Sequence, residues 1–239
     1  MKKNKKAIVI AGVAVLLVAA IVLVLVKTAG GLDVVGKDSA AAFEAVLNAA
    51  PGNVQADEEN GGWSLAAPDG SARFIWSQDY SSSPLYDVML AFEAEPFLNA
   101  GLEVSRLPEG YVLSQGKLVV GTKLGSDALA YQGAPTPLAA YEQIVSHYRS
   151  AIGYHTALDH YNVSLGGGNM FEWAKNIEEN SVTGENQDKD IVFVLNPEPF
   201  IEAGVDPEKV EGWVYTTVSM DMDGNAEDVY KFLKPFNLQ

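Results

Sequence analysis

The sequence contains no cysteine among its 239 residues and only three histidines. The absence of cysteine excludes disulfide bonds, cysteine nucleophiles and thiolate metal ligands. No nucleophile elbow or serine–lysine dyad is present. Gly166-Gly167-Gly168 is not a phosphate-binding loop, because the lysine and hydroxyl residue of such a loop do not follow it. The sequence therefore offers no catalytic motif, and its stability must come from packing.

Positive charge is scarce outside the N-terminal segment. Five of the 16 basic residues lie at or before Lys27, whereas all 31 acidic residues follow it. The strongly acidic remainder repels phosphate backbones and anionic lipid headgroups. We therefore expect no nucleic-acid partner and interpret the negative charge as a source of solubility.

One long apolar run stands near the N-terminus. Residues 1–6 are basic, and residues 7–26 are uninterruptedly apolar up to Lys27. About 20 residues at ~1.5 Å each match the ~30 Å hydrocarbon core of a bilayer. This pattern predicts a cytoplasmic tail (1–6), a single-pass transmembrane helix (7–26) and a linker (27–36), with the rest outside the cytoplasm at the cell membrane. The alternative is a cleaved secretory signal, but its apolar segment is usually only ~7–15 residues long.

The second half of the chain repeats the first. The segment EPFLNAGLE at residues 95–103 returns as EPFIEAGVD at residues 198–206. Both copies then reach a glycine-aromatic-valine step, at residues 110–112 and 212–214. We divide the chain into repeat 1 (37–132) and repeat 2 (133–239). Residues shared by the two copies indicate scaffold, and unshared residues are the candidates for function.

Each copy carries the pattern of one helix followed by strands. Ser39 and Thr136 are expected to cap the N-termini of the two opening helices, the second with Pro137 in its first turn. Alternating residues predict strands near residues 63–66, 74–76 and 88–92, and near 161–164, 171–173 and 191–195, with their large aromatics in the core. A long last strand is expected over residues 111–124 and again over 213–222. The predicted fold class is α+β, a tandem duplication of a helix plus a four-to-five-stranded, mostly antiparallel sheet.

Two further helices follow from terminal signals. The repeated Glu-Pro-Phe segment has proline in its first turn and ends at Gly101 and Gly204, which predicts a short glycine-terminated helix in each copy. Asn225 is followed by an acidic turn and by Val229 and Phe232, which predicts a closing C-terminal helix. We expect the two repeats to associate closely, because the link between them is short.

Two weak candidate sites come from residues that the copies do not share. His155, Asp159 and His160 could form a metal site or a general base, but the two histidines point to opposite faces of a continuous strand, and only a turn would let them converge.

Asp221, Asp223 and Asn225 resemble the start of a calcium loop. An EF-hand loop would need glycine and a carboxylate where Ala226 and Phe232 stand. We therefore assign no metal, cofactor or catalytic residue.

The function most consistent with these features is non-enzymatic. We expect a membrane-anchored extracytoplasmic protein that binds a ligand or supports an envelope assembly. A groove between the two halves would suit an envelope protein or peptide. The alternative is an extracytoplasmic hydrolase that acts on an envelope polymer through carboxylate or histidine groups.

Overall fold

Each half of the chain forms one helix followed by six antiparallel strands. The computed structural model describes residues 32–77, 86–124, 136–155, 158–177, 189–222 and 225–238. The predicted membrane helix of residues 7–26 lies outside this part. None of the described helices is long and apolar enough to cross a membrane.

The first copy runs from α2 to β6. Its elements are α2 (Leu32–Ala49), β1 (Val54–Asp57), β2 (Gly62–Ala66), β3 (Ala72–Ser77), β4 (Val88–Glu93), α3 (Glu95–Asn99), the 3₁₀ turn η2 (Val104–Arg106), β5 (Tyr111–Ser114) and β6 (Lys117–Thr122).

The second copy runs from α4 to β12. Its elements are α4 (Pro137–His147), η3 (Arg149–Ala151), β7 (Ile152–His155), β8 (His160–Gly166), β9 (Asn169–Ala174), β10 (Ile191–Leu195), α6 (Glu198–Glu202), η4 (Pro207–Lys209), β11 (Val214–Met222) and β12 (Asn225–Phe236).

The two sheets have the same strand order. It is β1-β2-β3-β4-β6-β5 in the first and β7-β8-β9-β10-β12-β11 in the second. This identity confirms the α+β class and fits a tandem repeat. Each sheet has six strands, not four or five, because an edge strand, β1 or β7, precedes the expected meander and the last element is a hairpin in both copies.

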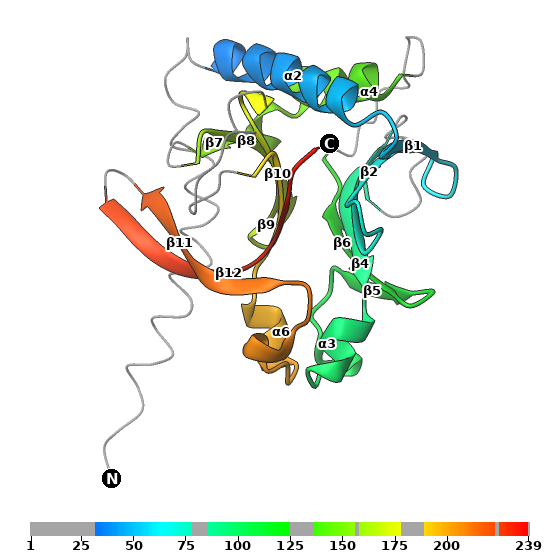
Figure 1. Ribbon diagram of the computed structural model, residues 1–239, viewed down its shortest axis with the longest axis vertical. Coiled ribbons are helices and arrows are strands. Elements are labelled where there is room, and N and C mark those ends of the chain that lie inside the picture. Colours follow the sequence, from blue (N-terminus) through cyan, green and yellow to red (C-terminus); the bar gives the residue numbers. More distant parts are fainter. Residues whose placement is uncertain are drawn as a thin grey trace.

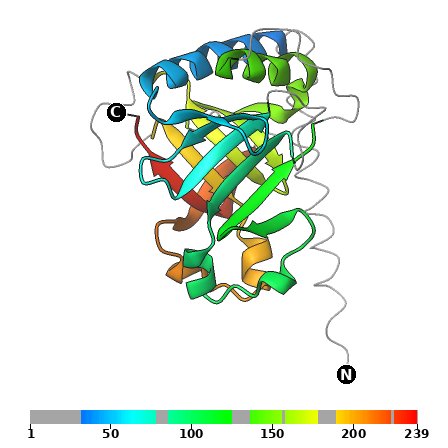
Figure 2. The same cartoon turned by 90° about the vertical axis from the view of Figure 1, so that its right-hand side faces the viewer.

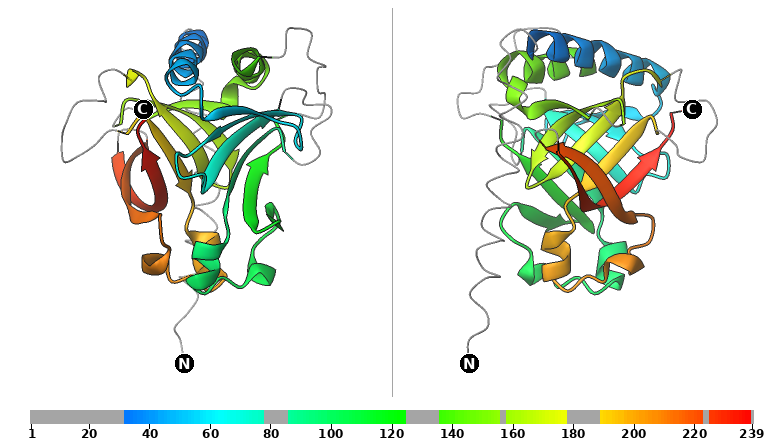
Figure 3. Two further views of the ribbon diagram at one scale, coloured as in Figure 1. Left: turned by 45° about the vertical axis from the view of Figure 1, so that its right-hand side comes forward. Right: turned by 90° about the vertical axis from the view of Figure 1, so that its left-hand side faces the viewer.

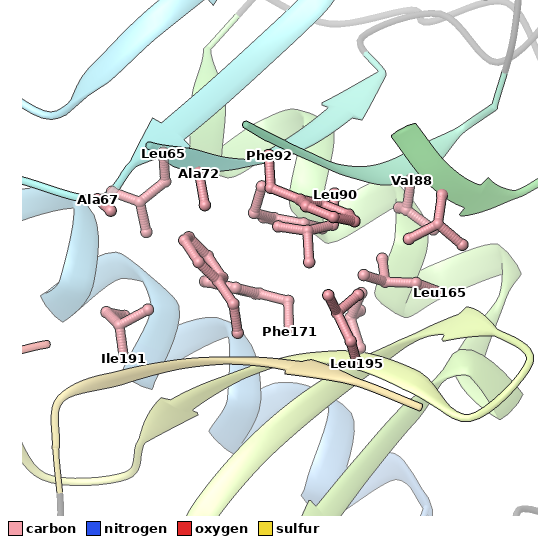
Figure 4. Close-up of a cluster of buried hydrophobic side chains, with 14 of the residues drawn as sticks. Leu65, Ala67, Ala72, Val88, Leu90, Phe92, Leu165, Phe171, Ile191 and Leu195 are labelled. Carbon is pink, nitrogen blue, oxygen red and sulfur yellow. The ribbon is translucent and has the colours of Figure 1, made fainter. Parts of the chain in front are cut away.

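The sheets face one another across a single core. Figure 3 shows the two sheets on either side of the molecule, with α2 and α4 across one end. In Figure 4, Leu90 and Phe92 of one sheet lie opposite Phe171 and Leu195 of the other. The rings of Phe74 and Phe171, which are equivalent in the two copies, stack with their centroids 4.2 Å apart. The predicted aromatic core is confirmed, and packed side chains fill the space between the two sheets.

The opening helices bind the two copies together. Helix α2 packs against α4 and against β7 and β9 of the second sheet, while α4 packs against β2 and β3 of the first (Figure 2). The Trp76 indole donates a hydrogen bond of 2.9 Å to the Pro137 carbonyl. Because each helix covers strands of the other copy, the halves form one folding unit and not two lobes.

The repeated Glu-Pro-Phe segment forms the predicted short helices α3 and α6 at the opposite end of the molecule (Figure 1). Gly101 and Gly204 have φ of +107° and +101°. Amides after each helix donate back to its last turn, Leu102 to the Phe97 carbonyl and Val205 to the Phe200 carbonyl. This is the predicted glycine-terminated ending in both copies.

The C-terminal ends of α3 and α6 also bind each other through two backbone hydrogen bonds, a contact that we call the clasp. Glu103 donates its amide to the Ala203 carbonyl, and Asp206 donates to the Ala100 carbonyl, both at 2.8 Å. A Cβ added to Gly101 would stand 2.8 Å from the Gly204 carbonyl oxygen. The repeated segment therefore joins the two copies symmetrically at a pseudo-twofold axis.

An ion pair adds to the contact between the copies. The Lys234 side chain is nearly buried, and its ammonium lies 3.0 Å from Asp69 Oδ2 in the β2–β3 turn. Burial alone would raise the pKa of Asp69, but hydrogen bonds from Ser71 and Lys234 lower it to about 2.

The expected start of the first helix is wrong. Helix α2 already includes residues 32–38, whereas the sequence predicts a linker up to residue 36. Ser39 lies inside the helix; its hydroxyl donates to the Gly36 carbonyl and accepts from the Tyr141 hydroxyl. Gly36 marks the helix crossing, because a Cβ there would stand 2.9 Å from Val145. The cap at Thr136 is confirmed: its hydroxyl accepts from the Ala139 amide.

The predicted closing helix is also wrong. Residues 225–236 form β12, which lies between β10 and β11, with Phe232 fully buried in the core. The helix-capping pattern after Asn225 is overridden because sheet pairing buries Phe232 and repeats the β5–β6 hairpin of the first copy. In that hairpin the expected single strand 111–124 reverses at Gln115 and Gly116, both at positive φ.

Candidate functional site

The two histidines meet on the outer face of the second sheet. His155 ends β7, His160 begins β8, and the two residues are direct cross-strand partners. Cross-strand partners share one face of a sheet. The turn between β7 and β8 thus places His155 and His160 on the same face, whereas a continuous strand would point them to opposite faces.

Asp159 does not join the two histidines. It occupies the turn with φ of +53°, and its carboxylate accepts a hydrogen bond from the Tyr154 hydroxyl. This hydrogen bond, with some burial, raises the pKa of Tyr154 to about 12. Asp159 therefore stabilises the turn by a local contact.

A cavity of about 140 Å³ lies on this outer face. Strands β7 to β12 all contribute to its wall, since the long β11–β12 hairpin places Val218 at the same cavity as His155. Apolar side chains make up most of the wall, and five ionisable residues interrupt it. The lining residues are His155, Leu158, His160, Met170, Glu172, Lys189, Val192, Val194, Val218, Lys231, Leu233 and Pro235.

The first copy closes the equivalent face with apolar side chains. There Ile75, Met89 and Ala91 form a small buried cluster. Strand register aligns Ile75 with Glu172 and Met89 with Val192. The copies thus differ at the centre of this face, where the second copy carries a carboxylate in place of an isoleucine.

The histidine positions differ in the same way. Register aligns His155 with Asp57 and His160 with Gly62. Asp57 accepts hydrogen bonds from Asn60 in its own turn, and a Cβ at Gly62 would stand only 2.2 Å from the Trp76 carbonyl oxygen. The first copy therefore has no room for the side chain that the second copy places there.

Glu172 is the central polar group of the cavity. Its residue is 3 % exposed. His155 Nδ1 lies 3.7 Å from Glu172 Oε2, which is too long for a hydrogen bond. Within the described part of the chain, Glu172 makes no hydrogen bond. A carboxylate without a hydrogen bond in a mostly apolar wall is a candidate contact for a ligand.

His160 contributes a second acceptor. The residue is fully buried, and its Nε2 lies 2.6 Å from the Lys189 carbonyl oxygen. Because a carbonyl accepts, Nε2 carries a proton, and in the neutral ring Nδ1 carries the lone pair. This Nδ1 is buried and has no hydrogen-bond partner among the described residues.

Lys231 is the polar group on the β12 side. Its ammonium donates to the Gly168 carbonyl at 3.2 Å, and burial lowers its pKa. The equivalent lysine of the first copy, Lys117, pairs with Glu93 at 3.0 Å. Register places Asn196 where Glu93 stands, so Lys231 faces no carboxylate at ion-pair distance within the described residues.

The weak calcium candidates lie at the tip of the β11–β12 hairpin. Met222 pairs with Asn225, which leaves two residues for the turn. Asp221 and Asn225 flank this turn on the two strands, and Asp223 lies outside the described residues. In the part that the structure describes, no three histidine or acidic residues are grouped so that they could hold a metal ion, and this includes His155 and His160.

Glu172 and Lys231 are the site residues that sequence reasoning missed. The signal for Glu172 was available, because a glutamate stands in repeat 2 where the aligned strand of repeat 1 has Ile75. The signal for Lys231 was not, because residues 225–236 were interpreted as a helix.

The chain matches no protein-family model, no curated protein and no solved structure. Its fold and candidate site define it as an internally duplicated, two-sheet α+β protein. The outer face of its second sheet carries a cavity lined partly by ionisable residues.

Proposed function

We propose that this chain is a membrane-anchored, extracytoplasmic binding protein that holds a small molecule in the cavity on the outer face of its second sheet. The anchor rests on the apolar residues 7–26. The binding role rests mainly on one observation, the replacement of the buried Ile75 by a buried Glu172 without a hydrogen bond from the described residues.

The size of the cavity limits the ligand. Drug-sized ligands occupy pockets of about 300–1,000 Å³, whereas an apolar cavity near 150 Å³ holds a molecule the size of benzene. At about 140 Å³ the cavity suits a small molecule or a single peptide side chain. An envelope peptide could therefore be held here only by one side chain or one end.

Binding is favoured over catalysis because of the contacts on the wall. Glu172 and His155 are too far apart for a hydrogen bond, and the apolar residues Val192 and Val194 lie in β10, the strand beside Glu172. Hydrolysis would need a nucleophile or a positioned water beside the general base.

The test is a small-molecule screen on the full-length chain in lipid nanodiscs, read by thermal shift and native mass spectrometry. The variant Val194→Phe fills the cavity and should abolish binding of every hit. The matched control Val119→Leu adds one methylene to the outer face of the first sheet and should leave binding intact. Hits that survive Val194→Phe would contradict the proposal, and turnover of a hit that is lost in Glu172→Gln would favour the hydrolase.

A further inference from the structure

The cavity has unlike polar groups at its two ends. Glu172 and, in the neutral ring, the Nδ1 atom of His160 are hydrogen-bond acceptors without a hydrogen bond from the described residues, and they belong to diagonal neighbours on β9 and β8. Diagonal side chains on adjacent strands lie about 7–8 Å apart or closer. This end can therefore receive one group with several donors, such as an ammonium.

The other end of the cavity carries a hydrogen-bond donor, the Lys231 ammonium. Glu172 pairs through Val192 with Pro235 of β12, and Lys231 lies four residues before Pro235. Four residues of strand span about 13 Å, and Glu172 and Lys231 both line the same cavity. The Lys231 ammonium, without the carboxylate partner that Lys117 has, is suited to a carboxylate.

The wall between the two ends is apolar. Val192 and Val194 of β10, with Leu233 of β12, lie in the rows between Glu172 and Lys231. They offer an aliphatic stretch of the ligand an apolar surface, and no hydrogen-bonding side chain interrupts these three positions.

From these three features we infer that the cavity binds an aliphatic amino carboxylate whose ammonium and carboxylate stand at opposite ends of the molecule. The ammonium lies against Glu172 and His160, the carboxylate against Lys231, and the methylene chain against Val192, Val194 and Leu233. This inference rests on the proposed binding function and specifies its ligand class.

The test compares three probes by calorimetry on the full-length chain in nanodiscs. ε-Aminocaproate carries both charged groups, hexylamine lacks the carboxylate, and hexanoate lacks the ammonium. Since hydrogen bonds to charged groups are the strong ones, we expect ε-aminocaproate to bind at least about ten-fold more tightly than either truncated probe.

Variants assign each end of the ligand. Glu172→Gln should weaken ε-aminocaproate and hexylamine but not hexanoate, and Lys231→Met should weaken ε-aminocaproate and hexanoate but not hexylamine. The control Lys117→Met removes the equivalent lysine of the first copy and should change none of the three affinities. Equal affinity for hexanoate and ε-aminocaproate, or an unchanged affinity in Glu172→Gln, would overturn the inference.

Benzene separates failure of this inference from failure of the binding function. If benzene binds and Val194→Phe blocks it while none of the charged probes binds, the cavity is a binding site and the ligand class is wrong. If neither benzene nor any charged probe binds, both proposals fail.

Discussion

Replacing Gly101 with alanine tests the clasp between the two copies. A non-glycine residue at its φ of +107° costs about 1–3 kcal/mol. The added Cβ would also stand 2.8 Å from the Gly204 carbonyl oxygen, so the two backbones must separate. Separation weakens the two reciprocal hydrogen bonds at 2.8 Å, each worth about 1 kcal/mol. We therefore expect Gly101→Ala to lower the free energy of unfolding by about 2 kcal/mol more than the conformational cost alone, because the clasp is weakened.

Gly110 supplies the matched control. Its φ is +102°, and a Cβ added there would have no atom within 4 Å. Gly110→Ala should therefore carry the conformational cost alone. In urea titrations followed by tryptophan fluorescence, Gly101→Ala should lie about 1 M below Gly110→Ala at a slope of about 2 kcal/mol per M. Equal midpoints for the two variants would refute the clasp.

Three further predictions concern the core, the site and pH. Phe74→Ala should lower the free energy of unfolding by about 3–5 kcal/mol, because it empties the stack between the sheets. Tyr230→Ala, at a residue 55 % exposed whose ring stacks on Tyr215, should lower it by only about 0.5–1.5 kcal/mol. Glu172→Ile installs the residue that the first copy has at Ile75 and should raise the free energy of unfolding by about 1 kcal/mol or more, while it abolishes ligand binding; a lower free energy of unfolding would argue that Glu172 is structural. The pKa of Asp69 is lowered from 3.8 to about 2, so its stabilisation is complete above pH 4 and is lost as the pH falls toward 2. Between pH 4 and pH 2 the free energy of unfolding of the wild type should therefore fall more than that of Asp69→Asn. The difference should be less than ~1 kcal/mol, because the Asp69 side chain is 59 % exposed. If the free energies of the two proteins fell in parallel over this range, the prediction would be contradicted.

Sequence patterns were sufficient where local geometry and tertiary packing agree. The cap at Thr136, the glycine endings at Gly101 and Gly204, and the buried aromatics Phe74 and Phe171 all follow from positions along the chain. Each is specified by neighbours within a few residues or by simple alternation.

The patterns failed where both faces of a strand are apolar. In β12, Phe232 faces the core while Leu233 lines the outer cavity, so period-two alternation is lost and the helical capping signal after Asn225 prevails. The β5–β6 hairpin of the first copy is the counterpart of β11–β12 and carries the same strand pairing.

The sequence predicts only part of the candidate site, because the site is assembled by sheet pairing between residues that are far apart along the chain. His155 and His160 were singled out because the first copy lacks them. Glu172 is twelve residues further along, and Lys231 lies on a different hairpin. Only sheet pairing brings these residues to one face, and no local pattern in the sequence reports that pairing.

The most direct test of the account is methyl NMR of the full-length chain in nanodiscs with added ε-aminocaproate. The account predicts shifts at the methyl groups of Val192, Val194 and Leu233, and none at Ile75 or Met89 on the equivalent face of the first sheet. Shifts confined to the first sheet, or no shift at the three cavity residues, would contradict the claim that the second copy's outer face is the binding site.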